Sequence, residues 1–353
     1  MMKISAWKIL GIVLLLYAFV VGLYIPLKPG ILNVDPNVAQ SGTRLTLNIE
    51  GYNTSFLKVD SINCWLKFDS IHFVKANHID KKTNVNLIAE FLIPNQLPDS
   101  TATNPTTLLI EDKLHGTILR PDAVFITKDT AQTSASDSIS WAKIPTHFAK
   151  ISYKTFPFRN ILEESIRNTY FHVPLWFAMI VLFGIACYYH VIFLRKGDLI
   201  LDEKSTSFIQ TGLIFGILGL LTGAVWAKYT WGAYWSGDVK QDMTAICLLI
   251  YLAYFVLRAS FDDEWKKARL SAVYGIFAFV SVFPLLFVIP RMKDSLHPGN
   301  GGNPALGSGD LDNTMRMVFY PSVIGFIILG IWISTLIYRY VRLKNIILER
   351  KQK

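Results

Sequence analysis

The residue types that could do chemistry are concentrated in one stretch, residues 226–240, which reads WAKYTWGAYWSGDVK and places five large aromatic rings within ten residues. An aromatic belt at a membrane surface would account for the rings, because Trp and Tyr favour the headgroup level. A belt would not require the small residues Gly232, Ala233 and Gly237, which let a flat molecule approach the backbone. This aromatic segment therefore predicts a binding surface for a large planar ligand.

Two histidines are expected on the same face as the aromatic segment. His172 precedes one apolar run, and His297 lies in a loop between two later runs. A metalloporphyrin needs aromatic rings to stack on, axial donors for its iron and cations near its propionates. Either histidine alone would be given a structural role, but the two together favour ligation of haem iron. The cations expected on this face are Lys228, Lys240, Arg291, Lys293 and Arg316.

A third histidine, His190, serves as the comparison for these two. It lies 18 residues after His172 on one predicted helix, about 27 Å along the axis, so the two cannot share an iron. We interpret it as an interfacial histidine whose ring reaches towards the lipid headgroups. A transmembrane cytochrome would need histidine pairs inside the spans at two depths, and the sequence has no such pairs. Electron transfer across the bilayer by bound haems is therefore disfavoured.

The elements that must position these residues are apolar runs long enough to cross a bilayer. The chain is 52% hydrophobic and only 17% charged, where a soluble domain carries about 25% charge. A bilayer core about 30 Å thick needs roughly 20 helical residues. We therefore expect a membrane protein with an α-helical bundle of six transmembrane helices. The runs are residues 9–27, 174–194, 207–227, 241–257, 270–290 and 318–338, of which 241–257 is the shortest.

The distribution of charge predicts the orientation of these spans. Lys and Arg beside spans are retained on the cytoplasmic side, and they favour cytoplasmic amino and carboxyl termini here. Residues 1–27 read as a retained anchor rather than a cleaved signal peptide, because no small-x-small cleavage site follows the run. The expected location is a bacterial inner membrane. The net charge of +9 is then a consequence of topology and indicates no nucleic acid as partner.

Residues 28–165 have a different composition, with short segments that alternate apolar and polar residues. Leu45, Leu47 and Ile49 alternate in one segment, and the series from Val85 to Ile93 does so in another. A period of two indicates strands, and six or seven of them favour an extracytoplasmic all-β domain, an immunoglobulin-like sandwich between the first and second helices. Residues 129–140 read as a long loop. The histidines of this domain, interpreted as surface or strand-edge residues in no metal motif, are His72, His78, His115 and His147.

The order of motifs after residue 165 resembles the CcmC branch of the CcmC/CcsA haem-handling proteins. The motifs are RNTYFHVP, LLTGAVWAKYTWGAYWSGD, FDDEWKKARL, SLHPG and DLDNTMR, and the resemblance covers roughly residues 165–350. It implies that His172 and His297 are the axial ligands of haem iron. This chain has Gly237 where family members commonly have a tryptophan. The residues that match the family's WWD motif are Trp226, Trp231, Gly232, Trp235 and Asp238, with Tyr234 where a tryptophan is common, and Asp312, Met315 and Arg316 match a D-x-x-M-R element.

The resemblance also implies a function. A protein of this branch binds b-type haem non-covalently at the periplasmic face and passes it to a periplasmic haem chaperone during cytochrome c maturation. The implied partners are that chaperone, a small membrane subunit and ABC-transporter components, and no covalent chemistry is expected of this chain. The alternative is a CcsA-type subunit that ligates haem to cytochrome c, although such synthases use more spans and further transmembrane histidines. A third hypothesis makes the protein a membrane-anchored adhesion or sensor subunit.

These expectations divide the chain into four parts. Residues 1–27 form an N-terminal transmembrane anchor, and residues 28–165 form the periplasmic β-sandwich-like domain. Residues 166–345 form a five-helix haem-handling membrane domain of WWD type, and residues 346–353 form a basic cytoplasmic tail. The resemblance does not account for the β domain, which is either a docking module or a structural extension.

Overall fold

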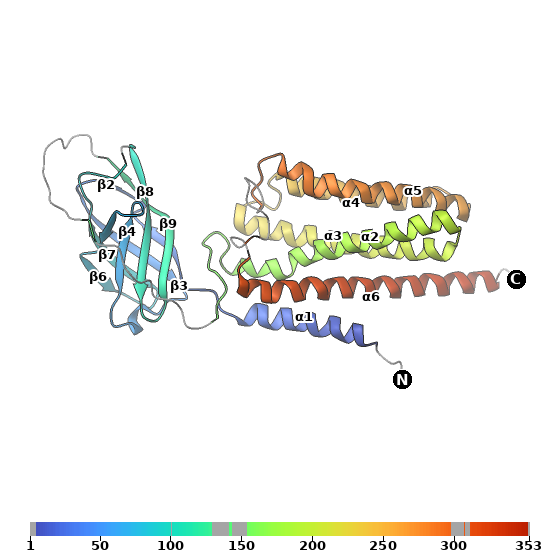
Figure 1. Ribbon diagram of the computed structural model, residues 1–353, viewed down its shortest axis with the longest axis horizontal. Helices are drawn as coiled ribbons and strands as arrows, with labels where there is room; N and C mark the ends of the chain where they lie inside the picture. Colours follow the sequence, from blue (N-terminus) through green and yellow to red (C-terminus); the bar gives the residue numbers. More distant parts are fainter. Residues whose placement is uncertain are drawn as a thin grey trace. The chain divides into compact units, whose positions relative to one another are not determined.

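The computed structural model describes residues 5–99, 101–128, 141–142, 154–297, 307 and 311–351. The predicted loop over residues 129–140 and His147 lie outside these residues. The chain divides into two compact units (Figure 1). One combines Met1–Ile25 with Glu164–Lys353 and is helical, and the other, Pro26–Glu163, is built from strands.

Six helices form the first unit within the described ranges, and all six are long and apolar enough to cross a membrane. This confirms the six spans predicted from the apolar runs, including the shortest one. All six helices begin before their apolar runs, and two of them end before the run does, at Tyr24 and Phe283. Their bounds are α1 (Ala6–Tyr24), α2 (His172–Lys196), α3 (Leu199–Trp231), α4 (Val239–Ala259), α5 (Glu264–Phe283) and α6 (Asn313–Lys351).

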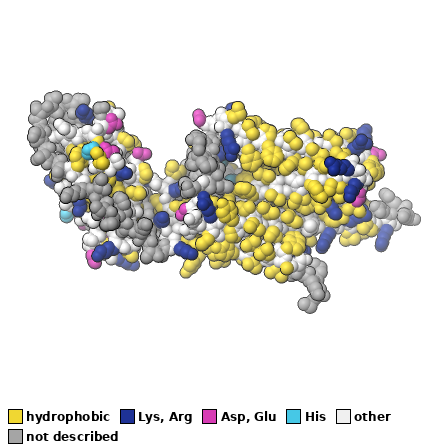
Figure 2. All heavy atoms as spheres, in the orientation of Figure 1, with side chains coloured by type: hydrophobic (Ala, Val, Ile, Leu, Met, Phe, Trp, Pro, Cys, Tyr) yellow, Lys and Arg dark blue, Asp and Glu magenta, His cyan; other side chains and the backbone are white. Residues whose placement is uncertain are grey.

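The helices lie alongside one another, with α2 packed against α3, α5 and α6 (Figure 1). α1 packs against α6, and α4 packs against α5. At the centre the rings of Phe183 and Tyr251 stack with centroids 3.5 Å apart. Side chains over the middle of the helices are mainly hydrophobic on the visible surface, and Lys and Arg gather towards the helix ends (Figure 2). An apolar outer surface is what a bundle surrounded by lipid requires.

Local sequence signals explain where the helices begin and end. α2 ends at Gly197, whose left-handed φ of 71° closes the last turn. Asp198, Asp238 and Asp263 stand directly before α3, α4 and α5, and each carboxylate accepts a backbone N–H of the first turn. Three short helices adjoin the six long ones: η2 (Glu163–Tyr170) before α2, and η3 (Pro284–Val288) and η4 (Ile289–Arg291) after α5.

The second unit contains two sheets in its described part. One has four strands in the order β1-β3-β7-β6, and the other has five in the order β2-β9-β8-β4-β5. Side chains from both sheets form one hydrophobic core, so the unit is a two-layer β domain. The bounds are β1 (Gly30–Asp35), β2 (Val38–Gln40), β3 (Arg44–Tyr52), β4 (Asn63–Lys67), β5 (Phe73–Lys75), β6 (His78–Lys81), β7 (Asn86–Leu92), β8 (Thr103–Asp112) and β9 (Gly116–Thr127), with a 3₁₀ turn, η1 (Phe56–Lys58), after β3.

The alternating pattern predicted the long strands well and the short ones poorly. Leu45, Leu47 and Ile49 are all buried on β3, as the period of two requires. In the second alternating segment, Val85 lies before β7 and is 39% exposed, so the buried positions of this segment begin at Leu87. The described strands number nine rather than six or seven, because β2, β5 and β6 are three or four residues long and too short to show a period.

Two histidines of the β domain, His72 and His115, form structural hydrogen bonds to neighbouring side chains. His115 is buried, which corrects its interpretation as a surface or edge residue. Its Nδ1 pairs with Asp112 at 2.7 Å, and its Nε2 accepts the Ser55 backbone N–H at 3.0 Å. His72 pairs with Asp69 in the same way. No group of three or more metal-ligating side chains occurs among the described residues.

Candidate functional site

The aromatic segment begins on a helix and not in a loop. Trp226 and Trp231 belong to the last turns of α3, which ends where Gly232 takes a left-handed φ of 83°. Only Gly adopts this conformation without strain, so Gly232 is needed to end the helix. The loop itself is residues 232–238, and Asp238 begins α4. The two tryptophans are therefore held by regular backbone.

Asp238 connects the start of α4 to the loop that carries His297. Its carboxylate is buried and accepts the Lys240 backbone N–H at 2.9 Å, which caps α4. It also accepts the Leu296 backbone N–H at 2.7 Å and the Ser295 hydroxyl at 3.1 Å. The Nδ1 of His297 lies 2.8 Å from the same carboxylate. One side chain thus fixes both a helix terminus and the orientation of an imidazole.

The charges at this pair follow from its surroundings. Burial alone would raise the pKa of the Asp238 carboxyl, but hydrogen bonds from Lys240 and Ser295 and the nearby His297 outweigh it and hold the pKa below its usual range. Burial lowers the pKa of His297, and the Asp238 carboxylate offsets this effect only in part. His297 is therefore neutral at neutral pH, with its proton on Nδ1 and a lone pair on Nε2.

His172, the first residue of α2, is held in the matching tautomer. The indole Nε1–H of Trp176 donates to His172 Nε2 at 3.2 Å, and an indole nitrogen only donates. Nε2 must therefore carry the lone pair, and Nδ1 carries the proton, which is donated to Thr222 Oγ1 at 3.0 Å. The Thr222 hydroxyl uses its own hydrogen on backbone oxygens of α3, including Leu218 O at 2.8 Å. Each hydrogen bond of this network therefore has one donor and one acceptor, with a single tautomer of His172.

The last turns of α3 bring the two histidines to one end of the bundle. The ring of Trp226 lies 5.8 Å from that of His172, and the ring of Trp231 lies 4.7 Å from that of His297, both edge to face. A Cβ at Gly223 would approach His172 Cε1 to 2.7 Å, so only glycine leaves room for this ring. We call this end of the bundle the site end.

The rest of the aromatic segment lines open space. A Cβ at Gly232 or Gly237 would meet nothing within 4 Å. The Tyr234 ring is exposed, and the Trp235 ring is half-exposed while its Nε1 donates to Asp242 Oδ1 at 3.0 Å. This open face, bounded by aromatic rings and two glycines, suits a flat ligand.

The predicted cations have different surroundings. Lys228 Nζ donates to Gly232 O at 2.8 Å and lies 5.8 Å from the centroid of the Tyr234 ring, so it closes the end of α3. The backbone N–H of Lys240 is taken by Asp238. On α6, Arg316 Nε is buried and has no hydrogen-bond partner among the described residues. Within the D-x-x-M-R element, Asp312 accepts the Met315 backbone N–H at 2.8 Å and Met315 is buried, so these two residues shape the start of α6.

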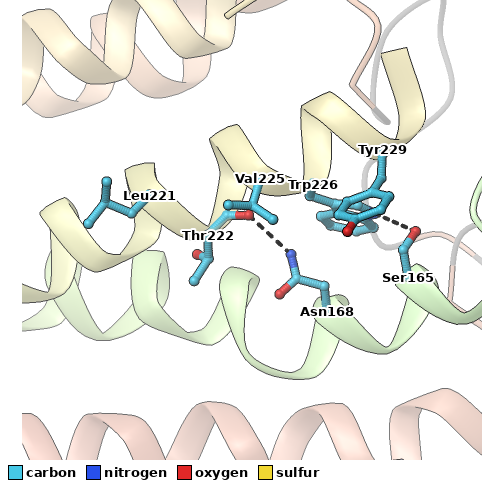
Figure 3. Close-up of a pocket in the computed structure, with 7 residues that line it drawn as sticks. All are labelled: Ser165, Asn168, Leu221, Thr222, Val225, Trp226 and Tyr229. Atoms are coloured by element: carbon cyan, nitrogen blue, oxygen red, sulfur yellow. Dashed lines mark hydrogen bonds between the residues drawn. The ribbon is translucent and has the colours of Figure 1, made fainter. Parts of the chain in front are cut away.

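A cavity of about 390 Å³ adjoins the His172 side of the site. Figure 3 shows the Trp226 and Tyr229 rings at one end of it and Asn168 pointing towards Thr222. Trp226 Nε1 donates to Ser165 Oγ at 3.0 Å across this space. Trp226 and Thr222 therefore face the cavity and contact His172 as well. The lining residues are Ser165, Asn168, Leu221, Thr222, Val225, Trp226 and Tyr229.

The His190 ring does not reach towards the lipid headgroups, which corrects the prediction. It is fully buried in the bundle, and neither ring nitrogen has a hydrogen-bond partner in the described part of the chain. A Cβ at Gly275 would approach His190 Nε2 to 2.5 Å, so α5 closes over the ring where it carries a glycine. The sequence pattern missed this because a glycine on another helix gives no local signal.

Three residues of the site were not singled out in the sequence, namely Trp176, Thr222 and Ser295. Trp176 follows His172 by four residues, a spacing that places both on one helix face and was a usable signal. Thr222 and Ser295 reach the histidines only through tertiary contacts.

Comparison with known proteins extends this picture. A family model described as CcmC, Heme exporter protein C, matches residues 149–353, more than half of the 353-residue chain. The chain belongs to the CcmC/CcsA haem-handling family. Membership makes it a membrane protein of cytochrome c biogenesis, in agreement with its six candidate spans. The matched region includes both histidines and the aromatic segment, while most of the β domain precedes it.

Curated relatives in the CcmC/CcsA family are similar over a shorter stretch. Cytochrome c biogenesis protein CcsA from Prochlorococcus marinus (strain NATL1A) is 38% identical over 80 residues, which is 23% of this chain and 25% of that protein. CcsA from Synechococcus sp. (strain CC9902) is 40% identical over 76 residues, or 22% of this chain and 25% of that protein. The chain thus spans about a quarter of the length of the curated relatives it matches.

Proposed function

We propose that this chain binds b-type haem non-covalently as cargo at the site end, with His172 and His297 as axial ligands of the iron. The observation that carries the proposal is the shared tautomer of the two imidazoles. Each has its Nδ1 proton engaged, by Thr222 or by Asp238, and each has its lone pair on Nε2. Histidines that ligate metals usually have this arrangement, in which the second nitrogen donates to a fixed acceptor.

The surrounding residues suit the other parts of a haem. The rings of Trp231 and Trp235 and the open space beside Gly232 and Gly237 offer faces for the macrocycle. Arg316, whose buried Nε lacks a partner among the described residues, is our candidate for a propionate, together with Lys228 and Lys240.

The topology and partners belong to the same proposal. We place both termini in the cytoplasm of a bacterium, and the site end and β domain on the periplasmic face, because Lys and Arg favour the inner side. As a member of the CcmC branch, the chain would pass haem to a periplasmic chaperone, alongside a small membrane subunit and ABC-transporter components. Its role is to bind and present haem, with no covalent step of its own, and release requires one axial bond to be surrendered to the acceptor.

The second candidate is a CcsA-type haem-ligation subunit, which the matched relatives named CcsA favour. The two candidates differ in their product. A carrier leaves haem extractable by acidified organic solvent, whereas a synthase subunit makes haem covalent to an added apocytochrome. Incubating the haem-loaded protein with a haem chaperone or with apocytochrome, followed by this extraction, therefore distinguishes the two candidate functions.

The test of haem binding is a titration of the purified protein in detergent with haemin. We expect saturable binding at one haem per chain and a six-coordinate visible spectrum, because two neutral imidazoles face the site. A protein that refuses haemin, or a five-coordinate spectrum at saturation, would refute ligation by both histidines.

Asp238→Ala is expected to weaken haem binding by about 10- to 100-fold, the usual effect of removing the group that orients a metal-bound histidine. It should also cost about 1 kcal/mol of stability, because α4 loses its N-cap. Haemin titration and thermal unfolding in detergent measure the two effects. The matched control is Asp198→Ala, since Asp198 caps α3 through an equivalent bond to Ile200 N at 2.9 Å. Equal haem affinity in the two variants would show that Asp238 acts only as a cap.

The β domain has a separate place in the proposal. We infer that it is an immunoglobulin-like sandwich that docks a partner in haem transfer, rather than a structural extension. Its two sheets over one core support the sandwich class, and its paired His115 and His72 leave the surface, not a metal site, as the functional feature.

A further inference from the structure

The ring nitrogen of His172 that the iron needs already has a partner. Trp176 Nε1–H donates to His172 Nε2 at 3.2 Å, four residues along the same helix. By contrast, no hydrogen bond to His297 Nε2 occurs among the described residues, where only its Nδ1 and backbone are engaged. The two proposed ligands are therefore not equivalent: the lone pair of His172 is covered by an indole N–H, whereas none of the described residues donates to that of His297.

We propose that Trp176 is a latch that covers the lone pair of His172 in the haem-free protein, so that haem iron reaches His297 first and His172 second. This inference rests on the proposed function. When the iron binds, the bond between iron and His172 Nε2 forms, and the hydrogen bond from Trp176 breaks. The proton stays on the indole, and no other group changes its protonation.

Three features hold the latch in place. The i, i+4 spacing on α2 sets the two side chains on one face. Thr222 fixes the His172 tautomer, so Nε2 carries no proton and can only accept a hydrogen bond or bind a metal through its lone pair. A Cβ at Gly219 would come within 2.8 Å of the Trp176 ring, so α3 carries a glycine where the indole rests. The indole is therefore seated against backbone on one side and against the imidazole on the other.

The latch also determines the order of release. Once haem is transferred, Trp176 Nε1–H can return to His172 Nε2 and replace the bond to iron. The bond from iron to His172 therefore competes with the Trp176 N–H, whereas the part of the chain that the structure describes offers no such competitor for the bond to His297. His172 is accordingly the axial ligand that is surrendered to the acceptor.

The test uses Trp176→Phe in the full-length protein, because phenylalanine keeps a ring but removes the donor. A neutral hydrogen bond is worth a factor of roughly 2 to 10 in an equilibrium constant. We expect Trp176→Phe to bind haemin tighter by this factor, with an unchanged six-coordinate spectrum. The matched control is Trp332→Phe, which changes a half-buried tryptophan of α6 and should leave the affinity unchanged. Equal or weaker haemin binding by a folded Trp176→Phe protein would overturn the latch.

Two further measurements separate the latch from the proposed function. In a His172→Ala background Trp176→Phe should have no effect on haemin affinity, because the covered atom is gone. In haem-free protein labelled with ¹⁵N-histidine, the His172 Nε2 resonance should shift in Trp176→Phe and not in Trp332→Phe. If the resonance shifts in Trp176→Phe but the wild-type protein binds no haemin, the proposed function is refuted while the contact between Trp176 and His172 stands. If Trp176→Phe does not fold, Trp176→Leu removes the same donor and is judged by the same outcomes.

Discussion

His297→Ala is expected to convert the haem-bound protein from a six-coordinate to a five-coordinate spectrum, and His172→Ala is expected to do the same. Each variant removes one axial nitrogen while the aromatic rings and the other histidine stay in place. The loss of affinity should exceed about 100-fold, since even the group that orients a ligand is worth about 10- to 100-fold. Visible spectra and haemin titrations of the purified variants measure both effects.

The control for these variants is His190→Ala. His190 is buried in the same helix as His172, so this change also removes an imidazole from the bundle, but far from the site end. Its haem spectrum should match that of the unchanged protein. Imidazole added to His297→Ala should restore the six-coordinate spectrum by occupying the vacated position. A six-coordinate spectrum in either single variant without added imidazole would mean that a different residue ligates the iron.

Asp202→Ala is expected to destabilise the bundle by about 3–5 kcal/mol, the usual result of removing one partner from a buried ion pair. Arg258 on α4 reaches Asp202 on α3 with two bonds of 2.7 and 2.8 Å, and both side chains are largely buried. Without the carboxylate the guanidinium has a charge with no counter-charge in an apolar surrounding. Thermal or denaturant unfolding in detergent measures the loss.

The companion variant replaces both partners, Asp202→Leu with Arg258→Met. It should recover most of the stability, because removing both charges also removes the cost of burying them. Asp202 lies 29 residues before Trp231 on α3, about 44 Å along the axis, so the haem spectrum of the folded protein should not change. If the double variant is as unstable as Asp202→Ala, packing and not the unpaired charge accounts for the loss.

The membrane helices were predictable because their signal is local and redundant. A span of about 20 apolar residues is visible in composition alone, and this found even the short run that became α4. The strands of the β domain were found only where they were long enough to alternate. β3 shows a full alternating pattern of burial, whereas the three residues of β5 show none. A short strand is stabilised by pairing with adjacent strands of the sheet, and a single sequence does not show which strands will be adjacent.

The site could be predicted in its parts but not in its connections. His172, His297 and Asp238 were singled out, yet Asp238 and His297 are 59 residues apart and nothing local indicates that they touch. The predicted third span ends at residue 227, whereas the helical backbone of α3 continues to Trp231. The burial of His190 was missed because it depends on Gly275 of another helix.

The double use of the Asp238 carboxylate makes the first turn of α4 and the imidazole of His297 parts of one cooperative unit. Fraying of this turn releases His297, and a ligand on His297 makes fraying more costly, because a ligand that binds one state of a protein stabilises that state. A ligand bound to His297 would thereby be coupled to the backbone of the helix that begins at Asp238. An acceptor that displaces the loop at residues 295–297 would weaken both the cap on α4 and the hydrogen bond that orients His297.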